Sequence, residues 1–270
     1  MRVALGISYA GTAYQGWQSQ LSGLTVQDKL ERALAEFAGG QERIRTVCAG
    51  RTDSGVHALN QVVHFDTALQ RDAFSWVRAT NRYLPQDVAV QWCRFVPDEF
   101  HARQSAVGRR YVYVVCASPV RPSLEANRVG WCWLPLDMEK MWEASSYLLG
   151  EHDFSAFRAS ECQAPTPVRH LYQLQIEQHG CYWCFEFRAN AFLQHMIRNL
   201  MGSLIAVGTG RYPAQWIKEV LESRQRELAA PTYAAEGLYF LGPEYEAHWG
   251  LPQEPETNMV LFPFYRCSNK

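Results

Sequence analysis

Residues 50–57, Gly-Arg-Thr-Asp-Ser-Gly-Val-His, contain the first side chains whose type and spacing could do chemistry. Asp53 is a short carboxylate between two glycines, which permit unusual backbone geometries that can hold such a side chain in a defined position. A carboxylate held in this way can act as a nucleophile or as a base. The same composition is also typical of a polar turn in which Asp53 bonds to nearby backbone. Taken alone, the segment favours the turn.

A second candidate is Arg198, which lies in the apolar segment 192–207. The spacing predicts a long helix that is apolar on nearly every side, and such a helix is buried. A buried guanidinium keeps its charge and requires a carboxylate or a phosphate beside it. Asp53 is one candidate partner. Asp153 and Glu236 are others, and pairing with either would give Arg198 a purely structural role.

The strand-like run 109–117 brings aromatic and basic side chains together. Its alternation places Tyr111 and Tyr113 on one face and Arg110 on the other. An aromatic side chain on a sheet beside arginines can stack on a nucleic-acid base. The alternative interpretation is that both tyrosines belong to the core.

The cysteines and histidines do not predict a metal site. Among the eight cysteines there is one C-x-x-C, formed by Cys181 and Cys184. A structural zinc site needs four ligands, and no second pair has a suitable spacing. His57, His64 and His195 also lack the spacing of metal ligands. The cysteines are therefore expected to be reduced, buried thiols.

The composition sets broader limits on the chain. Its 270 residues are 47% hydrophobic, which suffices for one large domain or two ordinary ones. No run of about 18 apolar residues predicts a membrane span, and the absence of a signal region at the N-terminus predicts a cytoplasmic protein. The net charge of −1 argues against a generic nucleic-acid binder. Only four of the 26 basic residues are lysines, and arginine suits phosphates and base edges.

The hydrophobic pattern predicts the elements that must position these residues. The expected order in the first part of the chain is strand, helix, strand, strand, helix, strand, which is a ferredoxin-like arrangement. A second α+β cycle follows, and its expected elements include helices over 137–149, 192–207 and 213–228 and a last strand over 237–241. The expected organisation is an N-terminal α/β subdomain (1–105), a C-terminal α/β subdomain (106–246) and an irregular surface tail (247–270).

Several segments, taken together in this order, are similar to one known family. The chain resembles the bacterial tRNA pseudouridine synthase A family, also called pseudouridine synthase I, from Leu5 to about Tyr245. Two small departures are Ser54, where the family often has alanine, and Asn60, where glycine is frequent. The matching segments are 14–20 (YQGWQSQ), 25–31 (TVQDKLE), 50–58 (GRTDSGVHA), 81–87, 100–103 (FHAR), 110–111 (RY), 150–155, 192–202 and 230–238.

The resemblance implies a function for the candidate residues. Asp53 would be the nucleophile, or the base of a related elimination route, in the isomerisation of uridine to pseudouridine. Arg198 would pair with Asp53, Tyr111 would pack against the target base, and Arg51 would lie near the flipped nucleotide. The substrate would be the tRNA anticodon stem-loop, at positions 38, 39 and 40, and the enzyme would act as a homodimer without cofactor or metal.

The resemblance also implies an α+β fold, the pseudouridine synthase fold. Two ferredoxin-like (RRM-like) halves would share an extended, mainly antiparallel sheet, with helices on one side and a central active-site cleft. Two alternatives have different chemistry. A non-catalytic module that binds or folds tRNA would need neither an Arg-Thr-Asp loop nor a buried Arg198. A hydrolase acting through Asp53 would need a second carboxylate as general acid, and none is evident near Asp53 in sequence.

Overall fold

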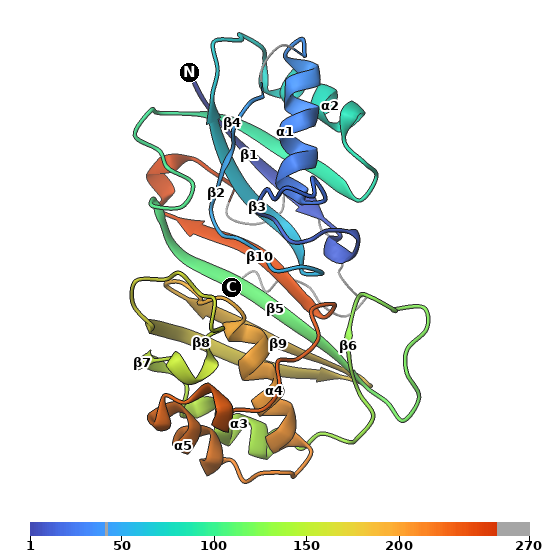
Figure 1. Ribbon diagram of the computed structural model, residues 1–270, viewed down its shortest axis with the longest axis vertical. Helices are drawn as coiled ribbons and strands as arrows, with labels where there is room; N and C mark the ends of the chain where they lie inside the picture. Colours follow the sequence, from blue (N-terminus) through green and yellow to red (C-terminus); the bar gives the residue numbers. More distant parts are fainter. Residues whose placement is uncertain (41–42, 253–270) are drawn as a thin grey trace. The chain divides into compact units, whose positions relative to one another are not determined.

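The computed structural model describes residues 1–40 and 43–252, and these form two compact units (Figure 1). The first unit comprises residues 1–108 and the described residues from 239 onward. The second comprises residues 109–238. The chain therefore leaves the first unit once and returns to it.

The first unit has the predicted ferredoxin-like order of elements. Strand β1 is antiparallel to β3 on one side and to β4 on the other, and β2 pairs with the far edge of β3. Within the unit the long strands lie in the order β4-β1-β3-β10. The elements are β1 (Arg2–Tyr9), η1 (Gly11–Ala13), α1 (Val26–Phe37), β2 (Val47–Cys48), β3 (His57–Asp66), α2 (Ala73–Tyr83), β4 (Val88–Val96), β10 (Leu238–Tyr245) and η4 (Ala247–Trp249).

Strand β10 occupies the part of the β3 edge that β2 leaves free. β2 has only two residues and pairs with Val63 and His64, near the end of β3. β10 runs parallel to β3 and pairs with its first residues, His57 and Ala58. The prediction placed 237–241 in the C-terminal subdomain, because strand neighbours distant in sequence leave no local signal. The boundary expected at residue 105 lies close to the observed division after Gly108.

Helices α1 and α2 cover one face of the first unit's sheet (Figure 1). Trp76 of α2 is fully buried there, with edge-on ring contacts to Phe37 of α1 at 4.9 Å and to Phe65 of β3 at 5.3 Å. Gly6 of β1 pairs across the sheet with Trp92 of β4. A Cβ on Gly6 would lie 2.0 Å from the Trp92 indole nitrogen, so only glycine leaves room for this indole.

A second apolar cluster includes Trp92, Phe100, Tyr245 and Leu251. Leu251 is buried in it and Trp249 packs against it. Leu251 therefore belongs to the core, which corrects the prediction of a surface tail at this residue, whereas Ala247, His248 and Gly250 are exposed. The remainder of the expected tail, 253–270, lies outside the described residues.

The second unit is a sheet with a group of helices on one face (Figure 1). Its long strands lie in the order β5-β9-β8-β7, each antiparallel to the next, and β6 is parallel to β5. Its elements are β5 (Ala106–Ala117, mostly in this unit), β6 (Gly130–Cys132), α3 (Met138–Ser146), β7 (Gly150–Asp153), η2 (Ser155–Phe157), β8 (Val168–His179), β9 (Tyr182–Ala189), α4 (Met196–Gly208), α5 (Gln215–Ser223) and η3 (Arg226–Leu228).

All three helices predicted for the second unit were too long, and the one expected over 137–149 covers only Met138–Ser146. The helix expected over 192–207 begins only at Met196, because His195 adopts a left-handed conformation with φ of 61°. The helix expected over 213–228 ends at Ser223, where Arg224 has a φ of 58°. Both units are α+β with mainly antiparallel strands and helices packed on the sheet, which confirms the predicted fold class. None of the described helices is long and apolar enough to cross a membrane.

Candidate active site

Asp53 lies in the loop formed by residues 50–57, here called the Asp53 loop. The Asp53 carbonyl accepts a hydrogen bond from Val56 N at 3.2 Å, which closes a four-residue turn. Gly55, the third residue of this turn, has a φ of 81°, a conformation that strongly favours glycine. The turn expected from the sequence is thus present in the backbone. The Asp53 side chain is half-buried, between the exposed Arg51 and the buried Val56.

A preceding segment, residues 10–17, packs directly against the Asp53 loop. Trp17 N donates to the Thr52 carbonyl at 3.1 Å, and the Ser54 hydroxyl donates to the Tyr14 carbonyl at 3.1 Å. Gly16 lies between these contacts with a φ of 80°. A Cβ there would be 2.7 Å from the Thr52 carbonyl oxygen and 3.2 Å from the Asp53 carbonyl carbon. The backbone that carries Asp53 therefore has a close neighbour that only glycine accommodates.

Buried polar side chains of β1 and β3 also hydrogen-bond to the Asp53 loop. The Tyr9 hydroxyl lies 2.7 Å from Thr52 Oγ1, and Gln61 Nε2 donates to the Gly50 carbonyl at 2.5 Å. Burial raises the pKa of Tyr9, so its phenol remains neutral in the physiological range. These contacts join β1 and β3 to both ends of the segment Gly50–Thr52. The sequence shows no sign of them, because the partners are about 10 to 40 positions apart.

His57 ends the loop and is held in place by two contacts. Its Nδ1 accepts a hydrogen bond from Gly11 N at 3.0 Å, so this nitrogen is unprotonated. Its ring stacks on Tyr239 of β10, with centroids 4.7 Å apart and an interplanar angle of 21°. The return of β10 to the first unit therefore fixes the residue at which the Asp53 loop joins β3.

Arg51 and Arg103 both act on the buried thiol of Cys48. Burial raises the pKa of Cys48, while a hydrogen bond from Arg103 and the positive charges of both arginines oppose this effect. Arg103 is thus a hydrogen-bonding neighbour of this thiol, and the charge of Arg51 acts on it as well. Arg103 belongs to the Phe100–Arg103 segment of the resemblance but has no role assigned from the sequence. Its position adds a second cation beside the Asp53 loop.

Tyr111 lies in the second unit on β5. Its ring meets that of Phe192 edge-on at 5.1 Å, and the side chain is 8% exposed. Tyr113, on the same face of the strand, is fully buried and donates from its hydroxyl to the Ala234 carbonyl at 2.8 Å. Arg110 faces the other way and pairs with Glu186 at 2.8 Å. The predicted faces are confirmed, and Tyr113 belongs to the core.

Arg198 lies in the first turn of α4. The side chain was predicted to be buried and is only half-buried, because the helix begins only two residues before it. Its Nε donates to the Tyr233 carbonyl at 2.9 Å, and Tyr233 N donates to the Arg198 carbonyl at 3.0 Å. These two bonds orient the guanidinium. The approach is close because Gly202 lacks a Cβ, which would lie 2.1 Å from the Pro231 carbonyl oxygen.

The two alternative partners of Arg198 differ in the structure. Asp153 is paired with Arg224 at 3.3 Å. Glu236 and Arg198 both act on the Tyr113 hydroxyl. Burial is the main cause of the raised pKa of Tyr113, the negative charge of Glu236 raises this pKa further, and the positive charge of Arg198 lowers it. Asp53 and Arg51 belong to the first unit, whereas Arg198 and Tyr111 belong to the second. The pairing of Arg198 with Asp53, the packing of Tyr111 on a base and the central cleft stay predictions.

The two cysteines of the C-x-x-C motif differ in burial. Cys184 is buried in β9, and burial raises its pKa to about 12. Cys181 is exposed, with its sulfur 4.0 Å from that of Cys116 on β5. Across residues 1–40 and 43–252, no group of three or more His, Cys, Asp or Glu side chains is arranged to hold a metal ion.

The chain is similar to known proteins over most of its length. The family model for tRNA pseudouridine synthase matches residues 6–104 and 144–246. A protein of Polaromonas naphthalenivorans called tRNA pseudouridine synthase A is 62% identical over 256 residues, covering 93% of this chain and 96% of that protein. One of Methylibium petroleiphilum with the same name is 62% identical over 253 residues, covering 94% and 96%.

A solved Cbf5-Nop10-Gar1 complex contains a chain with 13% identity and a TM-score of 0.35, which covers 84% of this chain and 60% of that one. The family model spans both segments that bear the candidate residues, because Arg51, Asp53 and Arg198 all lie within its matched ranges, although Tyr111 does not. With more than half of the chain matched and relatives at 62% identity, the chain belongs to the tRNA pseudouridine synthase family.

Proposed function

We propose that the protein isomerises uridine to pseudouridine in the anticodon stem-loop of tRNA, at positions 38, 39 and 40, with Asp53 as the catalytic carboxylate. The observation that carries the proposal is the placement of Asp53. Its backbone is held in a glycine-dependent turn that packs against Gly16, and Tyr9 and Gln61 hydrogen-bond to the preceding residues Thr52 and Gly50. Membership of the family supplies the reaction, and the name of the relatives supports a tRNA substrate.

The reaction is an isomerisation, so no oxidant or reductant takes part. In the nucleophilic route, Asp53 forms an ester with C1′ as the bond from C1′ to N1 breaks. The uracil leaves as an anion and turns, and its C5 then attacks C1′ and displaces the carboxylate. The C5 proton is lost and N1 gains one, so the atoms balance. In the elimination route, Asp53 instead removes the C2′ proton of the ribose as the bond from C1′ to N1 breaks, and it returns this proton to C2′ when C5 of the uracil adds to C1′. A carboxylate supports either route without a cofactor.

The other candidate residues have supporting roles in the proposal. A uridine stacked in a stem must be flipped before its C1′ can be reached. Tyr111 then packs against the flipped base, and the guanidinium of Arg198 pairs with the Asp53 carboxylate. Arg51 lies in the Asp53 loop, and with Arg103 it forms a positive region that suits the phosphates beside the flipped nucleotide.

A homodimeric assembly in the cytoplasm completes the proposal. Exposed apolar side chains on the second unit are consistent with an interface between copies: Val120 is 75% exposed, Leu124 91% and Trp133 63%. Light scattering of the purified protein would report the mass in solution. A mass of one chain over a range of protein concentrations would remove the dimer from the proposal.

The decisive experiment is to incubate the protein with tRNA labelled in its uridines and to map pseudouridine along the product. Pseudouridine at positions 38 to 40 is expected, without metal or cofactor in the buffer. Release of free uracil would indicate a hydrolase. Unchanged tRNA that remains bound would indicate the non-catalytic binding module, the second candidate considered above.

Replacing Gly16 with alanine is expected to lower the rate of pseudouridine formation by about 10²-fold, since a catalytic group displaced by about 1 Å can lose this much. The added Cβ would meet Thr52 and Asp53 backbone atoms at 2.7 and 3.2 Å and push the Asp53 loop away. Single-turnover rates at saturating enzyme would measure the effect on chemistry.

Gly23→Ala is the matched control. Gly23 also has a positive φ, of 66°, but a Cβ there meets nothing within 4 Å. Both variants should lose about 1–2 kcal/mol of stability through backbone strain, and only Gly16→Ala should lose rate. Equal rates for the two variants would show that contact with the Asp53 loop is unimportant.

A further inference from the structure

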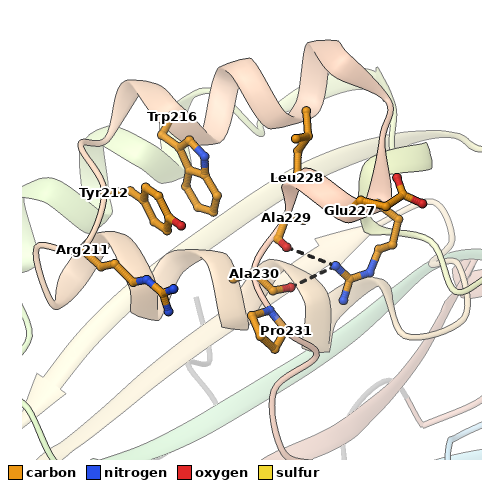
Figure 2. A pocket seen from close by; sticks show the side chains of 9 residues that line it. Arg211, Tyr212, Trp216, Glu227, Leu228, Ala229, Ala230 and Pro231 are labelled. Atoms are coloured by element: carbon orange, nitrogen blue, oxygen red, sulfur yellow. Dashed lines mark hydrogen bonds between the residues drawn. The ribbon is translucent and has the colours of Figure 1, made fainter.

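The second unit has an open groove beside α4 that the proposed reaction does not use (Figure 2). Its volume is about 410 Å³, a size typical of sites for small ligands or single nucleotides. It is bounded by the connection from α4 to α5, by the first turn of α5 and by the segment that begins with η3. The lining residues are Arg211, Tyr212, Trp216, Arg226, Glu227, Leu228, Ala229, Ala230 and Pro231.

Two aromatic rings form one wall of the groove. Tyr212 and Trp216 are stacked on each other, with ring centroids 4.0 Å apart and an interplanar angle of 11°. Their contact leaves no room between the rings, and both side chains are half-buried. The pair therefore presents ring surface to the groove (Figure 2). Such a surface can stack on a base of any kind, because every base has a π-face.

Two arginines add positive charge to the same groove. The guanidinium of Arg211 lies 5.5 Å from the Tyr212 ring centroid. Arg226 donates to neutral acceptors: the Ala230 carbonyl at 3.0 Å, Asn199 Oδ1 at 3.1 Å and Thr232 Oγ1 at 3.1 Å, with a longer contact of 3.4 Å to the Ala229 carbonyl. Within the described part of the chain, neither arginine forms an ion pair with a carboxylate.

We propose that this groove binds a nucleotide of the tRNA substrate, with its base on the Tyr212–Trp216 rings and its phosphate beside Arg211 and Arg226. The inference rests on the proposed function, because that function supplies the RNA. Charge complementarity selects the occupant: Glu227 is the one carboxylate among the lining residues, against two guanidiniums. A phosphate supplies a counter-charge to these two guanidiniums, whereas an apolar peptide does not.

Arg226 also has a structural role that limits its use in a test. Its bonds tie the segment 229–232 to Asn199 of α4, one residue from Arg198. Removing Arg226 would disturb Arg198 as well as the groove. Arg211 and Trp216 are better choices for substitution, because Arg211 is exposed and Trp216 is half-buried in the first turn of α5.

The test measures tRNA affinity of the full-length protein with Trp216→Ala and Arg211→Ser. Each variant is expected to raise the Kd and the KM for tRNA about 10-fold, because the loss of one base stack or one phosphate contact has an effect of this size. The kcat at saturating tRNA should stay unchanged. Arg211→Ser should also reduce the slope of log Kd against log salt by about one. Trp142→Ala, an exposed tryptophan on α3, and Arg224→Ser, an exposed arginine with a carboxylate partner, are matched controls.

If both groove variants keep the wild-type Kd and salt slope, the proposal is wrong. It is also wrong if the two control variants lose as much tRNA affinity as the groove variants. A lower kcat with unchanged Kd would also overturn it, because the groove would then act through the fold. If Trp216→Ala lowers thermal stability, Arg211→Ser alone decides. Failure of the proposed reaction would be seen in a different result. In that case the wild-type protein would bind tRNA through the groove but form no pseudouridine.

Discussion

Asp53→Asn is expected to abolish pseudouridine formation, with a loss of at least about 10³-fold in the single-turnover rate. The amide has nearly the size of the carboxylate, and the backbone turn through the Asp53 carbonyl does not depend on the side chain. What is lost is the negative oxygen that attacks C1′ or removes a proton. Affinity for tRNA should change by less than about threefold, because phosphate contacts dominate binding to nucleic acids.

Asp66→Asn provides the control for this variant. Asp66 lies at the far end of β3 and pairs with Arg2 at 2.8 Å, with a largely exposed side chain. The control removes the same charge from the same unit and should keep the wild-type rate. Pseudouridine formation at the wild-type rate by Asp53→Asn would end the assignment of Asp53. A parallel loss of rate in the control would attribute the effect to net charge.

Arg198→Met is expected to lower the single-turnover rate about 10²-fold, the size of effect seen when one charged or hydrogen-bonding group is removed from a reacting centre. Methionine has a similar length and apolar volume, so α4 should pack as before. The orienting bond from Nε to the Tyr233 carbonyl is lost together with the charge. Rates at saturating enzyme, with Kd for tRNA measured separately, would divide the effect between chemistry and binding.

Two further variants show which carboxylate Arg198 serves. Arg224→Met removes another guanidinium of the second unit, the one paired with Asp153, and should leave the rate unchanged. Glu236→Gln removes the carboxylate whose charge opposes that of Arg198 at the Tyr113 hydroxyl. If Arg198 serves Asp53, Glu236→Gln keeps most of the rate. A loss as large as that of Arg198→Met would instead make Glu236 the partner.

Local signals predicted the elements of the first unit well. The helix from Val26 begins where the Thr25 hydroxyl accepts from Asp28 N at 3.2 Å, and the helix from Ala73 begins where Asp72 accepts from Ser75 N at 2.7 Å. These caps involve residues three positions apart, so they can be read from the chain itself. The order of strands and helices follows from hydrophobic periods of the same short range.

Elements whose ends depend on distant contacts were predicted less well. The apolar period of α4 continues back to Phe192, yet the helix begins at Met196, where the Gln194 carbonyl accepts instead from Ala159 N at 3.1 Å. The helix expected over 213–228 is interrupted at Arg224, whose side chain reaches Asp153. In both cases a residue near the end of the helix contacts a partner from elsewhere in the second unit, and periodicity contains no information about such contacts.

The sequence by itself determined the turn that carries Asp53, because Gly55 and the neighbouring residues encode it locally. It also determined that a cation, Arg198, lies within an apolar helix. Only the tertiary structure decided that Gly16, Tyr9 and Gln61 hold the loop and that Tyr233 orients Arg198. A turn depends on conformational preferences of adjacent residues, whereas a close approach depends on which strands pair, and that is settled by the packing of the whole unit.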